Sequence, residues 1–305
     1  MSLNKLHKIF FIFIISFQFI LETNAQLVPV YSQYLVNQSI INPAYIGIDN
    51  CLNVNALYRQ QWFGFEGSPS TRTISAHTPL RNRKLAVGAN IVNDVIGVAS
   101  NTLVEGQFCY RIKVGDKAKV SFGMGAGLFI NKNNLASLKV NDNGDEVFAN
   151  NANSVMPTFS FGSYYENKNL FFGVSTLNLT RTIPRNRTFV YQQPLYFLAG
   201  YQYKMTETFA LTPSVLLNKI SNNPINMDLN VLMDFGKVIR FGVSYRTWNS
   251  FYGILQFKLN DQLQIGYAYE NTFSVLNKYQ SGSHEVSVKY VFKYKANTVD
   301  VKSFE

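Results

Sequence analysis

Apolar and polar residues alternate along many short stretches of this chain. In the segment 104–112, one face carries the apolar and aromatic side chains of Val104, Phe108, Tyr110 and Ile112. The opposite face carries Glu105, Gln107, Cys109 and Arg111. Because successive side chains of a β-strand point to opposite faces, this pattern predicts a strand that separates an apolar medium from a polar one.

About fourteen such strands are expected, each marked by period-two alternation of this kind. Their expected ranges are 51–59, 71–79, 84–94, 102–113, 118–130, 155–166, 168–178, 193–204, 208–218, 225–234, 237–246, 250–259, 263–270 and 284–294. Alternation repeated over a whole chain is typical of transmembrane β-barrels. The sequence therefore predicts an all-β transmembrane barrel of about 14 antiparallel strands.

The connections between the expected strands alternate between short and long. Short turns are expected at 80–83, 114–117, 205–207, 235–236 and 260–262, with Asn167 alone between the sixth and seventh strands. Longer connections are expected at 60–70, 131–154, 179–192, 219–224 and 271–283. Outer-membrane barrels have short periplasmic turns, longer outer loops and an even strand number. A soluble β-sandwich or propeller would not require this alternation, so we expect a Gram-negative outer-membrane protein with both termini in the periplasm.

The beginning of the chain has the features of a secretory signal peptide. A basic start is followed by a mostly apolar run over 9–21 and by a small-residue cleavage pattern that ends at Ala25. We therefore expect a signal peptide over 1–25, with cleavage between Ala25 and Gln26. No apolar run of about 18 residues follows, which argues against helical membrane spans.

Three further parts are expected after cleavage: an N-terminal segment over 26–50, the barrel over 51–295 and a C-terminal periplasmic tail over 296–305. The N-terminal segment is apolar. We expect it to enter the barrel from the periplasmic side and to plug part of the lumen, against the small inward residues of the strand at 118–130. The alternative is that it docks a periplasmic partner.

Composition fits a lipid-facing barrel better than a nucleic-acid-binding protein. The chain is 15% aromatic and only 15% charged, as expected for aromatic girdles that flank a lipid-facing band. The formal net charge is +10, but the basic residues are scattered rather than clustered on one element. We therefore expect outer-membrane lipid, and no nucleic acid, as a partner.

The two cysteines, Cys51 and Cys109, are both expected to face the lumen, on the first and fourth strands. Adjacent strands lie ~4.8 Å apart, so a separation of three strands is beyond the reach of a disulfide. Two free thiols are expected.

A series of motifs in the first third of the chain resembles a known family. The motifs are Asn42-Pro43-Ala44-Tyr45-Ile46-Gly47, Arg59-Gln60-Gln61-Trp62-Phe63-Gly64-Phe65-Glu66-Gly67-Ser68-Pro69, Ser75-Ala76-His77-Thr78-Pro79 and Asn93-Asp94-Val95-Ile96-Gly97. In this order they resemble the PorP/SprF family of the Bacteroidetes type IX secretion system. Weaker similarity continues through 242–246, 266–270 and 281–285.

The resemblance implies an outer-membrane component of type IX secretion that works with the secretion machinery. It also implies a secreted surface protein with a type B C-terminal domain as partner, such as an adhesin used in gliding motility. Candidate partner-binding or family-motif residues are Asn42, Pro43, Tyr45, Arg59, Trp62, Gly64, Gly67, Pro69 and His77.

The loop that begins at Arg59 has two interpretations. Its aromatic residues and Arg59 are typical of interface anchors, which favours a partner-binding surface. The structural alternative places Trp62 in the aromatic belt and neutralises Arg59 with lumen carboxylates such as Glu105. We favour the structural interpretation.

Little in the chain predicts catalysis, a cofactor or a metal. His77 and His284 are expected at opposite ends of the barrel, and Ser75, near His77, lacks a nucleophile motif. The segment 141–146 is rich in Asp and Asn, but its order does not match a calcium loop, so an exposed turn is expected. The alternative function is an outer-membrane porin or hydrophobic-solute transporter. The inward residues, mostly Asn, Ser, Gly and Gln, favour neither type of transporter.

Overall fold

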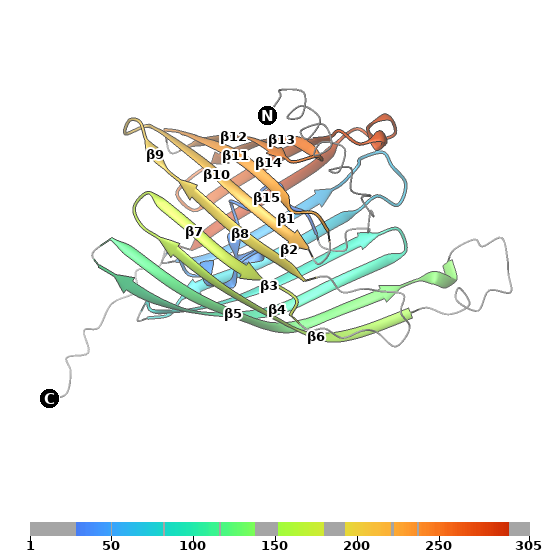
Figure 1. Cartoon of the computed structure of the whole chain (residues 1–305), viewed down its shortest axis with the longest axis horizontal. Coiled ribbons are helices and arrows are strands. Elements are labelled where there is room, and N and C mark those ends of the chain that lie inside the picture. The colour runs from blue at the N-terminus through green and yellow to red at the C-terminus, as the bar shows by residue number, and fades with distance from the viewer. Residues whose placement is uncertain are drawn as a thin grey trace, which may run out of the picture.

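The structure is a computed structural model, and it describes residues 29–49, 51–81, 83–115, 117–137, 152–179, 193–220, 223–236 and 238–292. Its strands form one antiparallel sheet in which strands that follow one another along the chain pair, with one interruption described below (Figure 1). The sheet closes because its first strand, β1 (Leu52–Gln60), pairs with its last, β15 (Ser283–Phe292), from Leu52 opposite Phe292 to Gln60 opposite His284. The predicted closed all-β barrel is confirmed.

Fifteen strands are assigned within the described residues. They are β1 Leu52–Gln60, β2 Ser70–Pro79, β3 Leu85–Ile96, β4 Ala99–Val114, β5 Ala118–Asn133, β6 Ala152–Glu166, β7 Leu170–Thr176, β8 Pro194–Tyr201, β9 Tyr203–Lys204, β10 Phe209–Ile220, β11 Asn226–Phe235, β12 Ile239–Arg246, β13 Ser250–Lys258, β14 Leu263–Thr272 and β15 Ser283–Phe292. β8 and β9 are separated by Gln202 alone and pair with β10 in one register. β8 and β9 therefore count as one strand of the wall, and the barrel has the predicted fourteen strands.

Four short 3-10 helices accompany the strands in the described part of the chain: η1 Gln38–Ile40, η2 Pro43–Tyr45, η3 Leu135–Ser137 and η4 Val275–Lys278. None of the helices in the described ranges is long and apolar enough to span a membrane.

The barrel has two distinct ends. At the turn end, strands are joined by the connections 80–84, 115–117, 167–169, 205–208, 236–238 and 259–262. At the loop end lie the longer connections, such as 61–69 and 273–282. Two loop-end connections depart from the expected alternation, because 97–98 and 247–249 are tight turns. Gly97 and Trp248 have positive φ values of 55° and 59°, the left-handed conformation that a tight reversal of direction uses.

The two faces of the wall follow the predicted pattern. In β4, the side chains of Glu105, Gln107, Cys109 and Arg111 are buried in the interior, whereas those of Val104, Phe108, Tyr110 and Ile112 are exposed on the outside. Large apolar side chains are exposed in the same way around the barrel, on β2, β5, β6, β11 and β15 among others. An apolar outer surface of this extent is typical of a transmembrane barrel wall.

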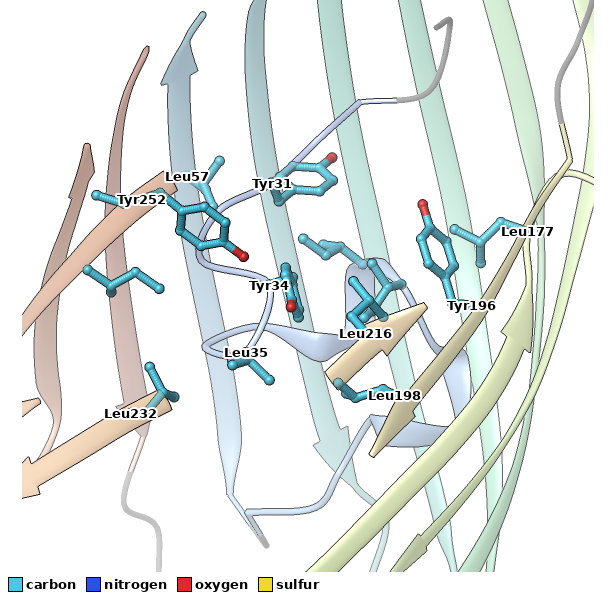
Figure 2. Close-up of a cluster of buried hydrophobic side chains, with 14 residues drawn as sticks. Tyr31, Tyr34, Leu35, Leu57, Leu177, Tyr196, Leu198, Leu216, Leu232 and Tyr252 are labelled. Atoms are coloured by element: carbon cyan, nitrogen blue, oxygen red, sulfur yellow. The ribbon is translucent and has the colours of Figure 1, made fainter. Parts of the chain in front are cut away.

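The interior is apolar on one side and polar on the other. A cluster of buried apolar side chains joins residues 29–49 to the wall formed by β8, β10, β11 and β13, as Tyr31, Tyr34, Leu198 and Tyr252 illustrate (Figure 2). On the opposite side, β1 to β6 present mainly polar residues to the interior. The core of this protein therefore lies inside the barrel, between its wall and its N-terminal segment.

Both cysteines are free, as predicted: Cys109 is buried and Cys51 is partly buried. Several predictions fall outside the described residues: the signal peptide over 1–25 with its cleavage between Ala25 and Gln26, the turn at 141–146 and the tail at 296–305.

The exposed apolar surface leads to a stability prediction. Met124, on the outside of β5, pairs with Phe108 and Phe161, which are also exposed, near the middle of these strands. We expect Met124→Arg to lower the free energy of unfolding in lipid vesicles by about 2–4 kcal/mol, because a cation would face hydrocarbon. Val114→Arg, at the turn end, should cost only about 0–1 kcal/mol. Equal costs at both positions would contradict a lipid-facing wall.

Candidate functional site

The most distinctive site in this protein is the path of residues 29–49, here called the luminal segment, through the barrel. Near its start, the carbonyl of Tyr31 accepts a hydrogen bond from Nη2 of Arg246 (2.9 Å), the last residue of β12 at the loop end. Near its finish, the carbonyl of Gly47 accepts a hydrogen bond from Nη1 of Arg111 (2.8 Å), close to the turn end. The luminal segment therefore runs from the loop end to the turn end.

This direction differs from the one expected from the sequence. We expected the segment to enter from the end with the short turns, but Tyr31 lies at the end with the long loops, beside Arg246. Two observations explain the direction of the luminal segment. Tyr31 is bound to Arg246 at the loop end, whereas β1, which follows the segment, starts at the turn end. A segment that is tied to Arg246 at its beginning and that leads directly into β1 has to cross the whole lumen.

Buried charges fasten the luminal segment at the loop end. Nη2 of Arg59 lies 2.8 Å from Oε2 of Glu270, and its Nη1 lies 3.3 Å from Oε2 of Glu285. Both oxygens of Glu285 also accept backbone N–H groups of the segment, from Ser32 (2.8 Å) and Gln33 (2.7 Å). Arg59 is only 1% exposed, so its charge depends on these two carboxylates.

A second arginine extends this network. Arg246 donates to Asp228 through Nε and Nη2 (both 2.9 Å) and to Glu270 through Nη1 (2.9 Å). Tyr252 donates its phenol proton to Asp228 (3.0 Å). Glu270 therefore bridges Arg59 and Arg246. We call the residues Arg59, Asp228, Arg246, Glu270 and Glu285 the loop-end charge network.

One predicted contact of Arg59 is wrong. Arg59 is neutralised by lumen carboxylates, as the structural interpretation expected, but not by Glu105. Because Arg59 is on β1, which pairs with β15, Glu285 lies directly opposite it in register. Glu105 is three strands away on β4, where it accepts a hydrogen bond from Ser160 (2.5 Å) instead.

Amide and hydroxyl groups hold the middle of the luminal segment. The carbonyl of Ser39 accepts from Nδ2 of Asn90 and from Nε2 of Gln107, each at 3.0 Å. Asn37 donates to Oγ of Ser75 (2.6 Å). The polar inner face of β2 to β4 thus satisfies the exposed backbone of a segment that has no sheet partner of its own.

The small-residue face of β5 receives the segment at Gly123, as predicted. A Cβ on Gly123 would lie 2.2 Å from the backbone nitrogen of Ala44, which is shorter than any real contact. Asn42 places Ala44 there, since its side chain accepts the Ala44 N–H (2.9 Å) and caps η2, whose first residue is Pro43. Asn42 also donates to the carbonyl of Ser163 on β6 (3.0 Å). These family-motif residues fix where the segment lies.

Tyr45 and His77 meet at the turn end. Nδ1 of His77 accepts the backbone N–H of Gly47 (3.1 Å), and the His77 ring makes an edge contact with Tyr45. Tyr45 also packs edge-on against Tyr164 of β6. Burial raises the pKa of the Tyr45 phenol well above its ordinary value, so this side chain stays neutral. His77 therefore anchors the backbone of the luminal segment.

The arrangement around His77 gives no support to catalysis. Ser75 binds Asn37 and His77 binds Gly47, so the described structure shows no hydrogen bond between this serine and this histidine. His284 contacts Tyr267 (2.7 Å) at the loop end. Within the described residues, no group of three or more His, Cys, Asp or Glu side chains is placed to hold a metal ion.

The aromatic loop 61–69 is anchored to the neighbouring loop 273–282. The backbone N–H of Phe63 donates to the carbonyl of Gly282 (2.7 Å), and Ser281 donates back to the carbonyl of Phe63 (2.8 Å). Trp62 is half-buried with a φ of 48°, and its backbone N–H donates to Oγ of Ser283 (3.2 Å). These contacts hold the loop in a defined position.

The other motif residues of this loop shape its turns. Gly64 and Gly67 have φ values of 90° and 71°, where glycine is favoured. The carbonyl of Gly67 accepts the N–H of Gly97 (2.9 Å), and the carbonyl of Pro69, which is buried, accepts that of Gln61 (2.8 Å). As a result, the loop presents Phe63 and Phe65 to the outside, 55% and 42% exposed.

Four residues of the loop-end charge network were not among the candidate partner-binding residues: Asp228, Arg246, Glu270 and Glu285. The last three, however, end the motifs at 242–246, 266–270 and 281–285. One signal was present, since each is a charged residue at an inward position close to a loop-end strand terminus. Their connection to Arg59 requires the closed barrel, in which β15 pairs with β1 and Glu270 of β14 bridges Arg59 and Arg246.

The contact at Gly123 predicts the effect of a side chain there. Gly123→Val should displace η2 and expose the luminal segment, since overpacking of this kind costs about 1–3 kcal/mol. The expected result is faster chymotrypsin cleavage at Tyr31 and Tyr34 in the folded barrel. Gly106→Val is the matched control, because its Cβ would meet nothing closer than 3.9 Å. Equal cleavage of both variants would contradict the role of this contact.

The loop-end charge network predicts a large effect of removing Arg59. Arg59→Leu leaves Glu285 buried without its cation, so the free energy of unfolding should fall by about 3–5 kcal/mol in a denaturant titration. Arg72→Leu serves as the control, because Arg72 is exposed on the outside of β2, opposite Tyr58. A loss of stability no greater than that of the control would rule out this role.

Comparisons with known proteins agree with the fold and identify the family. The barrel is similar to the monoaromatic hydrocarbon channel CymD, at 11% identity and a TM-score of 0.55, over 88% of this chain and 94% of that one. It is also similar to the Ralstonia pickettii toluene transporter TbuX, at 8% identity and a TM-score of 0.51, over 84% and 93%. No curated protein matches the chain significantly.

Structures as distant as these support the barrel fold alone. The family is identified by a match to a family model. The model of the type IX secretion system membrane protein PorP/SprF matches residues 23–290, which is most of the chain and includes every motif named above. The protein therefore belongs to the PorP/SprF family of type IX secretion system membrane proteins.

Proposed function

We propose that this protein is an outer-membrane component of type IX secretion that binds a secreted surface protein with a type B C-terminal domain. A gliding adhesin of a Bacteroidetes cell is a suitable cargo of this kind. Family membership over residues 23–290 is the single observation that carries the proposal. The protein acts by binding, without catalysis, and its loop end faces the cell exterior, as the long loops of outer-membrane barrels do.

The interior supports a binding role over free diffusion. The luminal segment is fastened to Glu285 at the loop end and to Arg111 and His77 near the turn end. A pore that opens freely would have to break buried charge-assisted hydrogen bonds at one of these places, each worth about 1.5–3 kcal/mol. The barrel is thus suited to serve as a rigid platform.

The loop end offers the contact surface that this role needs. Phe63 and Phe65 are exposed on a loop whose backbone is fixed to Gly282 and to Gly97. Exposed aromatic side chains on a pre-organised loop bind a partner with little loss of conformational entropy. We place the cargo contact on these two residues.

Transport of a hydrophobic solute is the second candidate. CymD is a hydrocarbon channel, TbuX is a toluene transporter, and both share the barrel fold. However, the hollow beside Tyr31 and Tyr34 in the lumen has a volume of only about 40 Å³, little more than one water molecule occupies. This close packing of the lumen around Tyr31 and Tyr34, near the loop end, favours the secretion role.

Deletion of the gene, followed by comparison of surface and medium proteins, tests the proposal. We expect one or a few type B cargo proteins to be lost from the cell surface, and the wild-type gene to restore them. The Phe63→Ala, Phe65→Ala double variant should restore them poorly, because it lacks the proposed contact. The matched control removes Phe235 and Phe257, two exposed phenylalanines at the turn end. Normal secretion with altered solute uptake would instead support the transporter.

A further inference from the structure

A second hollow region lies at the turn end of the barrel. It consists of two cavities of about 490 and 790 Å³ that share Asp49, Gln202 and Arg240 in their walls. The turns 167–169 and 205–208 border it on one side, and Tyr45, Ile48 and Asp49 of the luminal segment border it on another. We call this region the turn-end vestibule.

The walls of the turn-end vestibule carry more basic than acidic side chains. The basic ones are Lys117, Lys119, Lys168, Lys204, Arg240, Lys258 and Lys289, and the acidic ones are Asp49, Glu166, Glu207, Asp234 and Asp261. Eight of these groups form four ion pairs: Lys119 with Glu166, Arg240 with Asp234, Lys258 with Asp261 and Lys289 with Asp49. The remaining groups determine which ligand charge the vestibule favours.

Of the lining groups, Lys117, Lys168, Lys204 and the acid Glu207 are outside these four pairs, so basic groups remain in excess. Among the described residues, no carboxylate lies within 4.0 Å of the ammonium group of Lys117, Lys168 or Lys204. Lys117 and Lys168 are on the turns 115–117 and 167–169, and Lys204 ends β9 just before the turn 205–208, so their charges are spread around the mouth. Such spacing suits several negative charges along one extended molecule better than a single small anion.

The vestibule also has an apolar part. Leu35 of the luminal segment, Leu170, Phe171 and Leu232 line the smaller cavity. The larger cavity adds Phe209, Val238 and Ile239. A ligand that fits both parts carries apolar side chains as well as negative charges, which is the chemistry of an acidic polypeptide segment.

We propose that the turn-end vestibule binds an extended, acidic segment of a protein partner. Carboxylates of the partner pair with Lys117, Lys168 and Lys204, and its apolar side chains pack against Leu35 and Phe171. Because Ile48 and Asp49 form part of the wall, the bound segment touches the luminal segment directly. This inference goes beyond the proposed cargo role at the loop end, since it concerns the opposite mouth of the barrel.

Binding of a defined peptide to the purified full-length barrel in detergent tests the inference. The probe is a fluorescent peptide of Asp, Glu, Leu and Phe, and a second probe carries Asn and Gln in place of the acids. We expect the acidic peptide to bind and the neutral one to bind weakly. In the Lys168→Glu, Lys204→Glu double variant, the acidic peptide should bind about tenfold more weakly, measured by fluorescence anisotropy.

The Lys132→Glu, Lys278→Glu double variant is the matched control. Both of its lysines are exposed at the loop end, and the change in net charge is the same as in the vestibule variant. Equal weakening in both variants would mean that overall charge, and no site, attracts the peptide, which would overturn the inference. Displacement of the peptide by inorganic phosphate, beyond that by sodium chloride of equal ionic strength, would overturn it in favour of a small anion. Because no secretion is measured, neither result bears on the proposed cargo role.

Discussion

Closure of the sheet is the constraint on which the rest of this structure depends. In hydrocarbon, each unpaired backbone N–H or C=O group costs several kcal/mol, so a spanning sheet has to close on itself. The seam between β1 and β15 does this with a continuous register from Leu52 opposite Phe292 to Gln60 opposite His284. The seam also places Arg59 opposite Glu285, so the same pairing that closes the barrel creates the buried charge network inside it.

A closed wall of this kind creates a second requirement, because the polar part of its inner face needs hydrogen-bond partners. The luminal segment meets that requirement by supplying partners to the wall along its whole length, from Ser32 at Glu285 to Gly47 at Arg111. The wall in turn supplies hydrogen-bond partners to the segment. The segment has no strand partner and depends on side chains such as Asn90 for its backbone hydrogen bonds. The family motif around Asn42 and Pro43 thus has a structural reason, the close approach of Ala44 to Gly123.

The two ends of the barrel differ in what they offer to other molecules. The loop end presents the aromatic side chains of Phe63 and Phe65 on a fixed backbone. The turn end presents a basic, partly apolar vestibule bordered by Lys168 and Lys204. Since the luminal segment contacts the walls at both ends, a partner at either mouth lies next to the same element. A membrane protein of a secretion system can use such a platform to hold different partners on its two sides.

The sequence by itself determined the strands, their number and their faces, because period-two alternation is a local property of each stretch. It also predicted that small residues of β5 would receive the N-terminal segment, since the run around Gly123 leaves room on the inner face. Only the tertiary structure decided which inward residues meet. Arg59 binds Glu270 and Glu285 instead of Glu105, and the luminal segment starts at the loop end. Both outcomes depend on the register of the fourteen strands around the barrel. This register brings together residues more than two hundred positions apart, and no local sequence pattern encodes it.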